Sequence, residues 1–264
     1  MFRVDALKVI RFGSYPPAFN MAVDSRLLAL CESDPRAAFL RFYTWSPRAL
    51  SIGCLDKEGA IDAAGAAEHG VEVVRRPTGG RVVLHDQDLT YTVIVPRQGP
   101  NSEAIYVWIS ECIMAGLSSL GAEVELAGGA RTRSTVPGRP CFLSAARHEI
   151  VSSGKKLVGS AQRLGRRAVL QHGTIPIGRG YLGVVEYLAC ADSEKEEMRG
   201  RMACETTCLA DVLGAPPDAS SVAAALEKAF RARLRADAVS LAPDVFCREA
   251  SAPQSSAPVH PNCT

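Results

Sequence analysis

The chain has 264 residues, of which 47% are hydrophobic, and a formal net charge of +2. These values are typical of a globular protein and exclude a disordered chain or one built around basic contacts to nucleic acid. No apolar run reaches the roughly 18 residues that a membrane-spanning helix requires, and the first residues lack the pattern of a secretory signal. We therefore expect a cytoplasmic protein with neither a nucleic acid nor a membrane as its partner.

Helical and extended patterns alternate along the first half of the chain. Apolar residues at helical spacing follow Asn20, which we expect to cap the N-terminus of a helix. Two further helices, each ended by a glycine, are expected over residues 57–69 and 102–120. Strands are expected over residues 38–43, 49–53, 71–75, 82–84, 89–95 and 122–126.

Three consecutive strands are predicted in the second half of the chain, and short hairpin turns at Gly154 and Gly165 connect them. They occupy residues 148–152, 156–163 and 168–176, and helices follow over 182–188, 207–213 and 220–238. Consecutive hairpins require antiparallel pairing, and the elements do not alternate strictly as in a parallel βαβ fold. The sequence therefore predicts an α+β (mixed α/β) fold, in which helices flank a mixed and largely antiparallel sheet.

A pair of glycines, Gly79 and Gly80, lies between two predicted strands and follows Arg75 and Arg76 closely. Glycines allow the backbone to approach a ligand and to expose its N–H groups. The arginines could meet a carboxylate or a phosphate there. From glycine and arginine alone, an ordinary hairpin turn is the preferred interpretation.

The nine cysteines are an odd number and indicate free thiols in a reducing compartment. Cys204 and Cys208 lie four residues apart, but no histidine or second cysteine pair accompanies them, so we expect a structural role and no metal site. Cys141 differs because it ends an irregular, arginine-rich loop just before a strand, where reacting groups often lie. On context alone, a catalytic role for Cys141 is still the less favoured interpretation.

The strand predicted over residues 156–163 contains three small residues in succession. They would leave a hollow beside the sheet, and Lys156 at its mouth could supply a fixed positive charge. Strict alternation places Lys156, Val158, Ser160 and Gln162 on one face of this strand, and Leu157, Gly159 and Ala161 on the other. A closely packed strand with an exposed lysine explains the same residues equally well.

Taken in order, these segments resemble the lipoate/biotin ligase and transferase superfamily. The resemblance covers about residues 8–215. It rests on Arg75-Arg-Pro-Thr-Gly-Gly-Arg-Val-Val-Leu-His-Asp86, Gly154-Lys-Lys-Leu-Val-Gly-Ser-Ala-Gln-Arg163, Leu170-Gln-His-Gly-Thr-Ile175, Asn20-Met-Ala-Val-Asp24 and Trp45-Ser-Pro-Arg-Ala-Leu-Ser-Ile-Gly53. Pro140-Cys141-Phe142, placed shortly before the lysine pair, is similar to the octanoyltransferase branch, whose members acylate the H protein of the glycine cleavage system during lipoate synthesis.

The resemblance implies a biotin/lipoate ligase-transferase catalytic domain over residues 1–215, and we expect a helical extension of it over 216–249. Residues 250–264 are rich in serine, proline and alanine, which predicts a flexible tail. The resemblance also implies that Cys141 is the nucleophile and that Lys156 faces the acyl thioester. It implies further substrate-binding residues at Arg76, Gly79, Gly80, His85, Gly159, Ser160, Ala161, His172 and Gly173. After Phe142 the chain departs from the family pattern, in which we would expect an aspartate and an aromatic residue. The resemblance therefore defines the chemistry better than it defines the donor or the acceptor.

The implied activity is the transfer of octanoyl from acyl carrier protein to a lysine of a lipoyl-domain or H-type acceptor protein. No cofactor is expected, because a carrier-bound thioester is already activated. Basic loops would face the acidic carrier and steer its encounter. Three alternatives stay open: an ATP-dependent lipoate–protein ligase that holds an acyl-adenylate with Lys156, a lipoyl amidotransferase that acts through Cys141, and a lipoyl-binding module without turnover.

Overall fold

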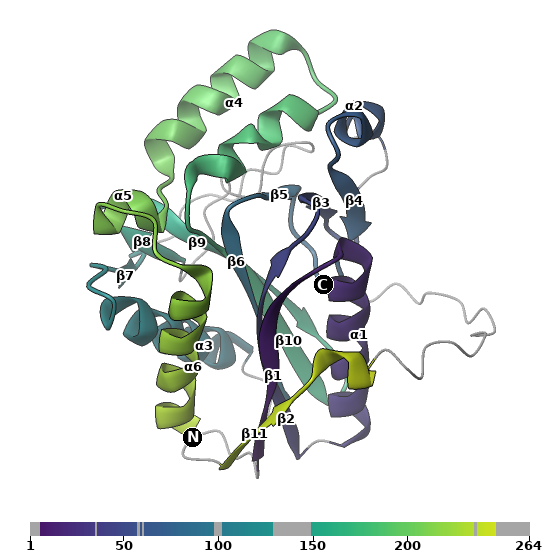
Figure 1. Cartoon of the computed structure of the whole chain (residues 1–264), viewed down its shortest axis with the longest axis vertical. Helices are drawn as coiled ribbons and strands as arrows, with labels where there is room; N and C mark the ends of the chain where they lie inside the picture. Colours follow the sequence, from purple (N-terminus) through teal and green to yellow (C-terminus); the bar gives the residue numbers. More distant parts are fainter. Residues whose placement is uncertain are drawn as a thin grey trace, which may run out of the picture.

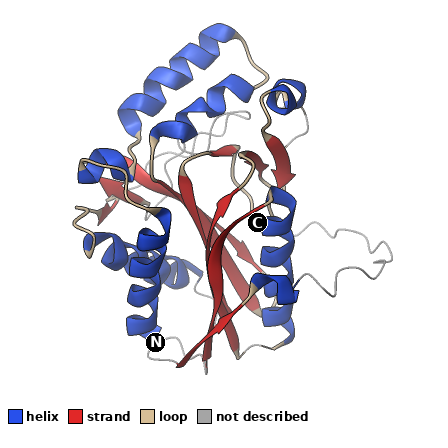
Figure 2. Ribbon diagram, viewed as in Figure 1, coloured by secondary structure: helices blue, strands red, loops and turns tan. Residues whose placement is uncertain are grey.

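The computed structural model of the chain describes residues 6–34, 36–56, 59, 61–97, 102–128, 149–234 and 237–246. The predicted nucleophile Cys141, the arginine-rich loop before it and the predicted tail lie outside the described residues. Within the described part, helices pack on both faces of one large sheet, and a small sheet with further helices lies at one end of it (Figures 1 and 2).

Eight strands form the large sheet, in the order β11-β1-β2-β6-β10-β9-β8-β7. They are β1 (Ala6–Tyr15), β2 (Ala37–Trp45), β6 (Asp88–Pro96), β7 (Glu125–Leu126), β8 (Ile150–Ser152), β9 (Lys155–Leu164), β10 (Ala168–Pro176) and β11 (Asp237–Leu241). The β11–β1 and β1–β2 pairs are parallel, and every neighbouring pair from β2 onward is antiparallel. The predicted fold class, a mixed and largely antiparallel sheet flanked by helices, is confirmed.

The small sheet has the order β4-β3-β5 and packs against its own set of helices. Its strands are β3 (Ala49–Ile52), β4 (Glu72–Arg75) and β5 (Val83–His85). The helices in the described part of the chain are α1 (Pro17–Ser33), α2 (Ala63–Glu68), α3 (Ser102–Ser118), η2 (Arg179–Tyr187), α4 (Asp192–Glu205), α5 (Leu209–Leu213), α6 (Ala219–Leu234) and η3 (Pro243–Phe246). In the part of the chain that the structure describes, no helix is long and apolar enough to cross a membrane.

Strand β6 shows how alternating side chains build the two faces of the large sheet. Tyr91 and Val93 enter an apolar core beneath α3 and α6, whereas Ile94 enters a second core beneath α1. The helices α3 and α6 approach closely at Gly116, where a Cβ atom would lie 2.9 Å from Leu226 Cα. Any larger residue at that position would push the two helices apart.

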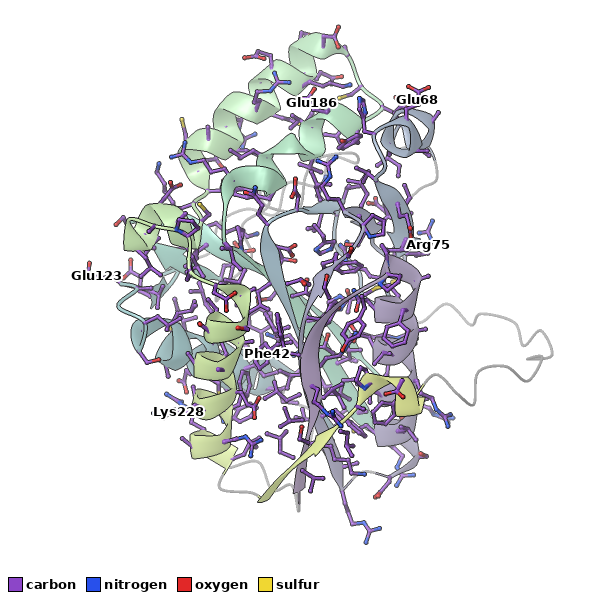
Figure 3. The ribbon with its side chains drawn as sticks, in the orientation of Figure 1. Phe42, Glu68, Arg75, Glu123, Glu186 and Lys228 are labelled. Carbon is purple, nitrogen blue, oxygen red and sulfur yellow. The ribbon has the colours of Figure 1, made fainter. Side chains whose placement is uncertain are left out.

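The interior and the surface follow the expected division of residue types. Phe42, in the middle of β2, is buried in the core beneath α6, whereas Glu186 and Lys228 are exposed at the edge of the molecule (Figure 3).

The start of α1 differs from the prediction. The helix begins at Pro17, whose fixed φ suits a first helical turn, and Asn20 lies inside the helix. The buried Asn20 amide donates to the carbonyls of Tyr15 and Thr44, at 3.2 and 3.3 Å. The predicted Asn20 cap is therefore wrong, because contacts with β1 and β2 engage the side chain.

Both ends of the described chain contribute strands that the sequence did not reveal. β1 precedes the first predicted element, and the helix expected to reach residue 238 ends at Leu234, before β11. These two strands pair with each other in parallel. The expected helix over residues 57–69 is reduced to α2, and α4 lies where no element was predicted.

Candidate active site

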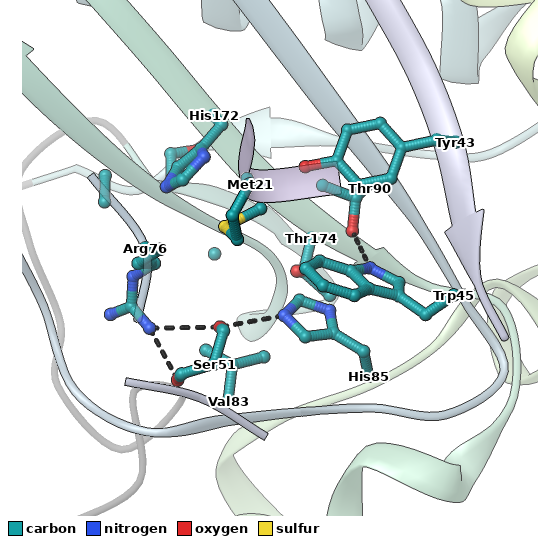
Figure 4. Close-up of a pocket in the computed structure, with 14 residues that line it drawn as sticks. Met21, Tyr43, Trp45, Ser51, Arg76, Val83, His85, Thr90, His172 and Thr174 are labelled. Carbon is teal, nitrogen blue, oxygen red and sulfur yellow. Dashed lines mark hydrogen bonds between the residues drawn. The ribbon is translucent and has the colours of Figure 1, made fainter. Parts of the chain in front are cut away.

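A cavity of about 370 Å³, including its mouth, lies on the α1 face of the large sheet, where that sheet meets the small one (Figure 4). Its lining residues are Met21, Tyr43, Trp45, Ser51, Arg76, Val83, His85, Thr90, Gly159, Ser160, Ala161, His172, Gly173 and Thr174. Seven of the predicted site residues thus meet at one cavity: Arg76, His85, Gly159, Ser160, Ala161, His172 and Gly173. Residues far apart in the sequence come together here because β10 lies between β6 and β9.

A β-bulge in β9 decides which side chains of this strand reach the cavity. Val151 pairs with Lys156, but Ile150 pairs with Val158, so β9 carries one extra residue at this point. Leu157 and Val158 consequently both enter the core beneath α3 and α6. The predicted strict alternation, which placed Lys156 and Val158 on one face, is wrong because of this bulge.

Beyond the bulge, the alternation of β9 resumes. The Ser160 hydroxyl lies 2.6 Å from the Tyr91 hydroxyl on the core face, so Gly159 and Ala161 face the cavity. On the other side of the bulge, Lys156 falls on this same face. The small side chains leave room for the cavity, and the bulge places a lysine on its face of the sheet.

The neighbouring strand requires glycine at position 173. A Cβ atom there would lie 2.4 Å from the carbonyl oxygen of Gly159 and 2.6 Å from a ring carbon of Tyr91. Gly173 pairs with Tyr91 on one side and with Ser160 on the other. Any side chain would force β9 outward and alter the shape of the cavity.

His85 is fixed in the cavity wall by contacts on several sides. Its Nδ1 lies 2.9 Å from Asp88 Oδ2, and its Nε2 lies 2.9 Å from Ser51 Oγ. The Trp45 ring stacks on the imidazole with 4.0 Å between centroids, and the indole N–H donates to Thr90 Oγ1 at 2.8 Å (Figure 4). The polar atoms of this wall are therefore paired with one another.

Arg76 shapes the glycine loop from within the cavity wall. Its guanidinium donates to the carbonyls of Ser51, Gly79 and Arg81, at distances from 2.6 to 3.1 Å. Gly80 has a φ of +92°, a conformation that favours glycine. Gly79 and Gly80 thus form the loop that Arg76 holds, and they are not among the residues that line the cavity.

Asp24 is the centre of a buried polar cluster behind the cavity. Arg41 Nη1 donates to Asp24 Oδ1 at 2.9 Å, and the hydroxyls of Tyr43 and Thr92 donate to Oδ2 at 2.9 and 2.8 Å. The side chains of Asp24 and Arg41 are both fully buried, where a charge is tolerated only with such partners. The cluster joins α1 to β2 and β6.

His172 connects this cluster to the glycine loop. Its Nε2 lies 2.5 Å from Thr78 Oγ1, whereas its Nδ1 lies 3.6 Å from Asp24 Oδ2, beyond hydrogen-bond distance. Burial lowers the pKa of His172, although Asp24 opposes the shift. Burial alone would raise the pKa of Asp24, but His172 and Arg41 outweigh it and lower that pKa. At neutral pH the site therefore holds a charged Asp24 and a neutral His172.

Lys156 is buried in an ion pair and does not line the cavity. Its Nζ lies 2.6 Å from Glu149 Oε1, and both side chains are 6% exposed. The Lys156 carbonyl accepts from the Thr207 N–H at 2.9 Å, which fixes this part of β9. The lysine predicted at the mouth of a hollow is instead on the cavity face of the sheet with a carboxylate beside it.

The sequence prediction missed the polar residues that support the cavity, namely Asp24, Arg41, Ser51, Asp88 and Glu149. For two of them a signal existed, since Asp24 lies on the apolar side of a helix and Arg41 interrupts an apolar strand. Nothing local distinguishes Ser51 or Glu149, because their partners lie on other strands or beyond a turn.

The match to a known family is decisive for the identity of the fold. The family model described as lipoyl protein ligase A/B catalytic domain matches residues 16–231, which include all the residues lining the cavity. The chain belongs to this family. Its relatives include octanoyltransferase LipM of Kyrpidia tusciae, 35% identical over 239 residues that cover 87% of each chain. The LipM of Exiguobacterium sp. is 34% identical over 256 residues, which cover 92% of this chain and 91% of the relative.

These relatives confirm the predicted superfamily and its octanoyltransferase branch, and with it the predicted enzyme class, an acyltransferase. Solved structures confirm the fold. The bipartite lipoate protein ligase of Thermoplasma acidophilum has a TM-score of 0.74 at 18% identity and covers 94% of this chain and 92% of its own. A lipoate-protein ligase A bound with ATP has a TM-score of 0.71 at 20% identity, with 93% and 94% covered.

Proposed function

We propose that the chain transfers an octanoyl group from acyl carrier protein to a lysine of a lipoyl-accepting protein, such as the glycine cleavage H protein, through a thioester on Cys141. The reaction would belong to lipoate biosynthesis in the cytoplasm. The observation that carries this proposal is the cavity. Gly159 and Ala161 of β9 leave room in it for an acyl chain. The relatives named octanoyltransferase LipM support the choice of acyl group.

The cavity suits an unbranched acyl chain. Met21, Trp45 and Val83 give it apolar walls, and the polar groups of His85 and Ser51 bond to each other. Burial of a methylene group contributes about 0.8 kcal/mol, so seven apolar carbons would contribute roughly 6 kcal/mol. That energy is sufficient to select a donor by its chain.

The chemistry needs a nucleophile and no activation by nucleotide. The Cys141 thiol loses its proton and its sulfur attacks the carbonyl carbon of the carrier thioester. The carrier thiolate leaves and takes up a proton, and an acyl-enzyme thioester of similar energy remains. The neutral amine of the acceptor lysine then attacks this carbonyl, the Cys141 thiolate leaves and accepts the proton released by the amine, and an amide results.

We assign Lys156 to charge stabilisation in both steps. Its ammonium, on the cavity face of β9, would favour the Cys141 thiolate over the thiol, whose ordinary pKa is about 8.5. The same charge would stabilise the oxyanion that develops on the carbonyl oxygen. Backbone N–H groups of the loop at Gly79 and Gly80 would share that task.

The protein partners are proposed from charge and from relatives. Arg75, Lys155, Arg166 and Arg167 are exposed, and such cations would steer an acidic carrier protein to the enzyme. The Thermoplasma acidophilum ligase belongs to a lipoylation system with an E2 lipoyl domain, which supports a lipoyl-type acceptor for this chain.

Intact-mass analysis tests the proposal. Purified protein is mixed with octanoyl-acyl carrier protein without ATP, for the wild type and for Cys141→Ser. We expect an octanoyl adduct on the wild type that hydroxylamine removes and that the variant lacks. Acylation of H protein that appears only with free octanoate and ATP would instead identify an ATP-dependent ligase and reject the Cys141 thioester.

A further inference from the structure

The Glu149–Lys156 ion pair differs from most ion pairs of the molecule. In the described part of the chain, the other lysine– or arginine–carboxylate pairs have partly exposed side chains, with the exception of Asp24–Arg41. Exposed pairs contribute little to stability, whereas buried charges are costly to remove from water. A buried ion pair therefore calls for a structural or functional role that offsets the cost of removing its charges from water.

A structural reason is apparent for one buried pair and not for the other. Asp24–Arg41 joins a helix to the sheet. Glu149 and Lys156 flank the β8–β9 hairpin, whose strands are already joined by backbone pairing. Two apolar side chains of similar volume would serve a hairpin equally well or better.

Backbone hydrogen bonds to other segments hold both Glu149 and Lys156 in place. The Glu149 carbonyl accepts from the Ala127 N–H at 2.8 Å, and the Lys156 carbonyl accepts from the Thr207 N–H at 2.9 Å. The 2.6 Å contact between the side chains then fixes where the ammonium lies. The bulge in β9 sets this ammonium on the cavity face, together with Gly159.

The position of the Lys156 ammonium depends on this partner. The carboxylate of Glu149 lies at hydrogen-bond distance from it, and both side chains are buried. An ammonium has three N–H donors, and Glu149 takes one of them.

We infer that Glu149 is a positioning residue for acyl transfer, whose carboxylate holds the Lys156 ammonium in place on the cavity face. The inference rests on the role of Lys156 under the proposed function. In this inference Glu149 acts on the reaction through Lys156 and not by direct contact with the thioester or the acceptor amine.

A double-mutant cycle tests this dependence. The rate of octanoyl-adduct formation at saturating octanoyl-acyl carrier protein is measured in single turnover for the wild type, Glu149→Gln, Lys156→Met and the double variant. Misplacement of a reacting group by about 1 Å can cost about a hundredfold, so we expect Glu149→Gln to slow the wild type roughly ten- to a hundredfold. In the Lys156→Met background we expect a change of less than about twofold.

Two further variants separate positioning from general damage. Glu149→Asp keeps the charge but withdraws it, so its rate should lie between those of the wild type and Glu149→Gln. Glu111→Gln breaks the 2.7 Å pair with Arg233 between α3 and α6 and should leave the rate unchanged. Melting temperatures of all variants identify any that fail to fold, and if Glu149→Gln is one of them, Glu149→Asp carries the test.

The outcomes are distinct. Equal slowing by Glu149→Gln in both backgrounds, or no slowing in the wild type, overturns the inference and leaves the proposed function intact. So does a Glu149→Asp rate equal to that of the wild type. If Lys156→Met alone is as fast as the wild type, the proposed role of Lys156 fails and the inference fails with it. An absent adduct on the wild type rejects the proposed function itself.

Discussion

The two faces of the large sheet are built from the same strands but bury different kinds of residue. Beneath α3 and α6, β6 contributes Tyr91 and Val93 to an apolar core. Beneath α1, the same strand contributes Thr90 and Thr92, which bond to Asp88 and Asp24. The first face supplies stability through close packing, and the second supplies a cavity that a fixed polar cluster supports. One strand serves both purposes because its side chains alternate.

The largest loss of stability should follow from removal of Asp24, the centre of the buried polar cluster. Asp24→Ala leaves the guanidinium of Arg41 buried without its carboxylate, and loss of one partner of a buried pair costs about 3–5 kcal/mol. Urea denaturation measures the free energy of unfolding. Asp24→Asn, which keeps the shape of the side chain, should lose less, and an Asp24→Ala protein as stable as the wild type would contradict the role of this cluster.

A large-to-small substitution in the apolar core should lower the stability of the fold without changing the rate of acyl transfer. Ile109, on α3, is fully buried, and its replacement by alanine should cost about 2–5 kcal/mol because it leaves a cavity. The rate of octanoyl-adduct formation per folded molecule should equal that of the wild type. A slower rate at unchanged folded fraction would show that the two faces are coupled.

Filling the cavity should change selectivity more than stability. Ala161→Leu extends a side chain into the cavity, so the cost should stay below the roughly 1–3 kcal/mol of overpacking a dense core. Adduct formation from octanoyl-acyl carrier protein should slow more than that from a butanoyl carrier. Leu226→Met, in the core beneath α3, is the matched control, and equal slowing of both donors by Ala161→Leu would argue against the acyl chain lying here.

The smallest effect should be a loss of stability in mild acid. The pKa of His172 is lowered from 6.5 in the folded chain, so the unfolded chain binds a proton first as the pH falls. Stability from this residue is fully present above about pH 6.5 and is lost below it. The lowered pKa of Asp24 places its own loss below about pH 4, outside this window.

Thermal unfolding between pH 7.5 and 5 measures this slope. His172→Gln should flatten the slope, because the other histidines titrate in both proteins. An unchanged slope in the variant would assign the acid sensitivity to another group.

The long strands and the small residues of the cavity could be predicted from the sequence. β6 follows from its β-branched residues and the proline that ends it, β10 follows from the short turn at Gly165 before it, and the hollow at Gly159 and Ala161 follows from side-chain size alone. Both are local properties that can be predicted from a single segment of the sequence. The motif blocks around Arg76 and His172 likewise pointed to residues that meet at the cavity.

Which side chains face one another depends on the tertiary structure and could not be predicted from the sequence. The Asp24 cluster joins α1 to strands distant in sequence, and β1 pairs with β11 at the other end of the described chain. Local periodicity predicts neither contact, because the partners lie far apart in the sequence. The bulge in β9 is also invisible locally, because the extra residue is defined only by the register of β8. That single residue turns Lys156 toward the cavity face, where Glu149 can hold its ammonium in place.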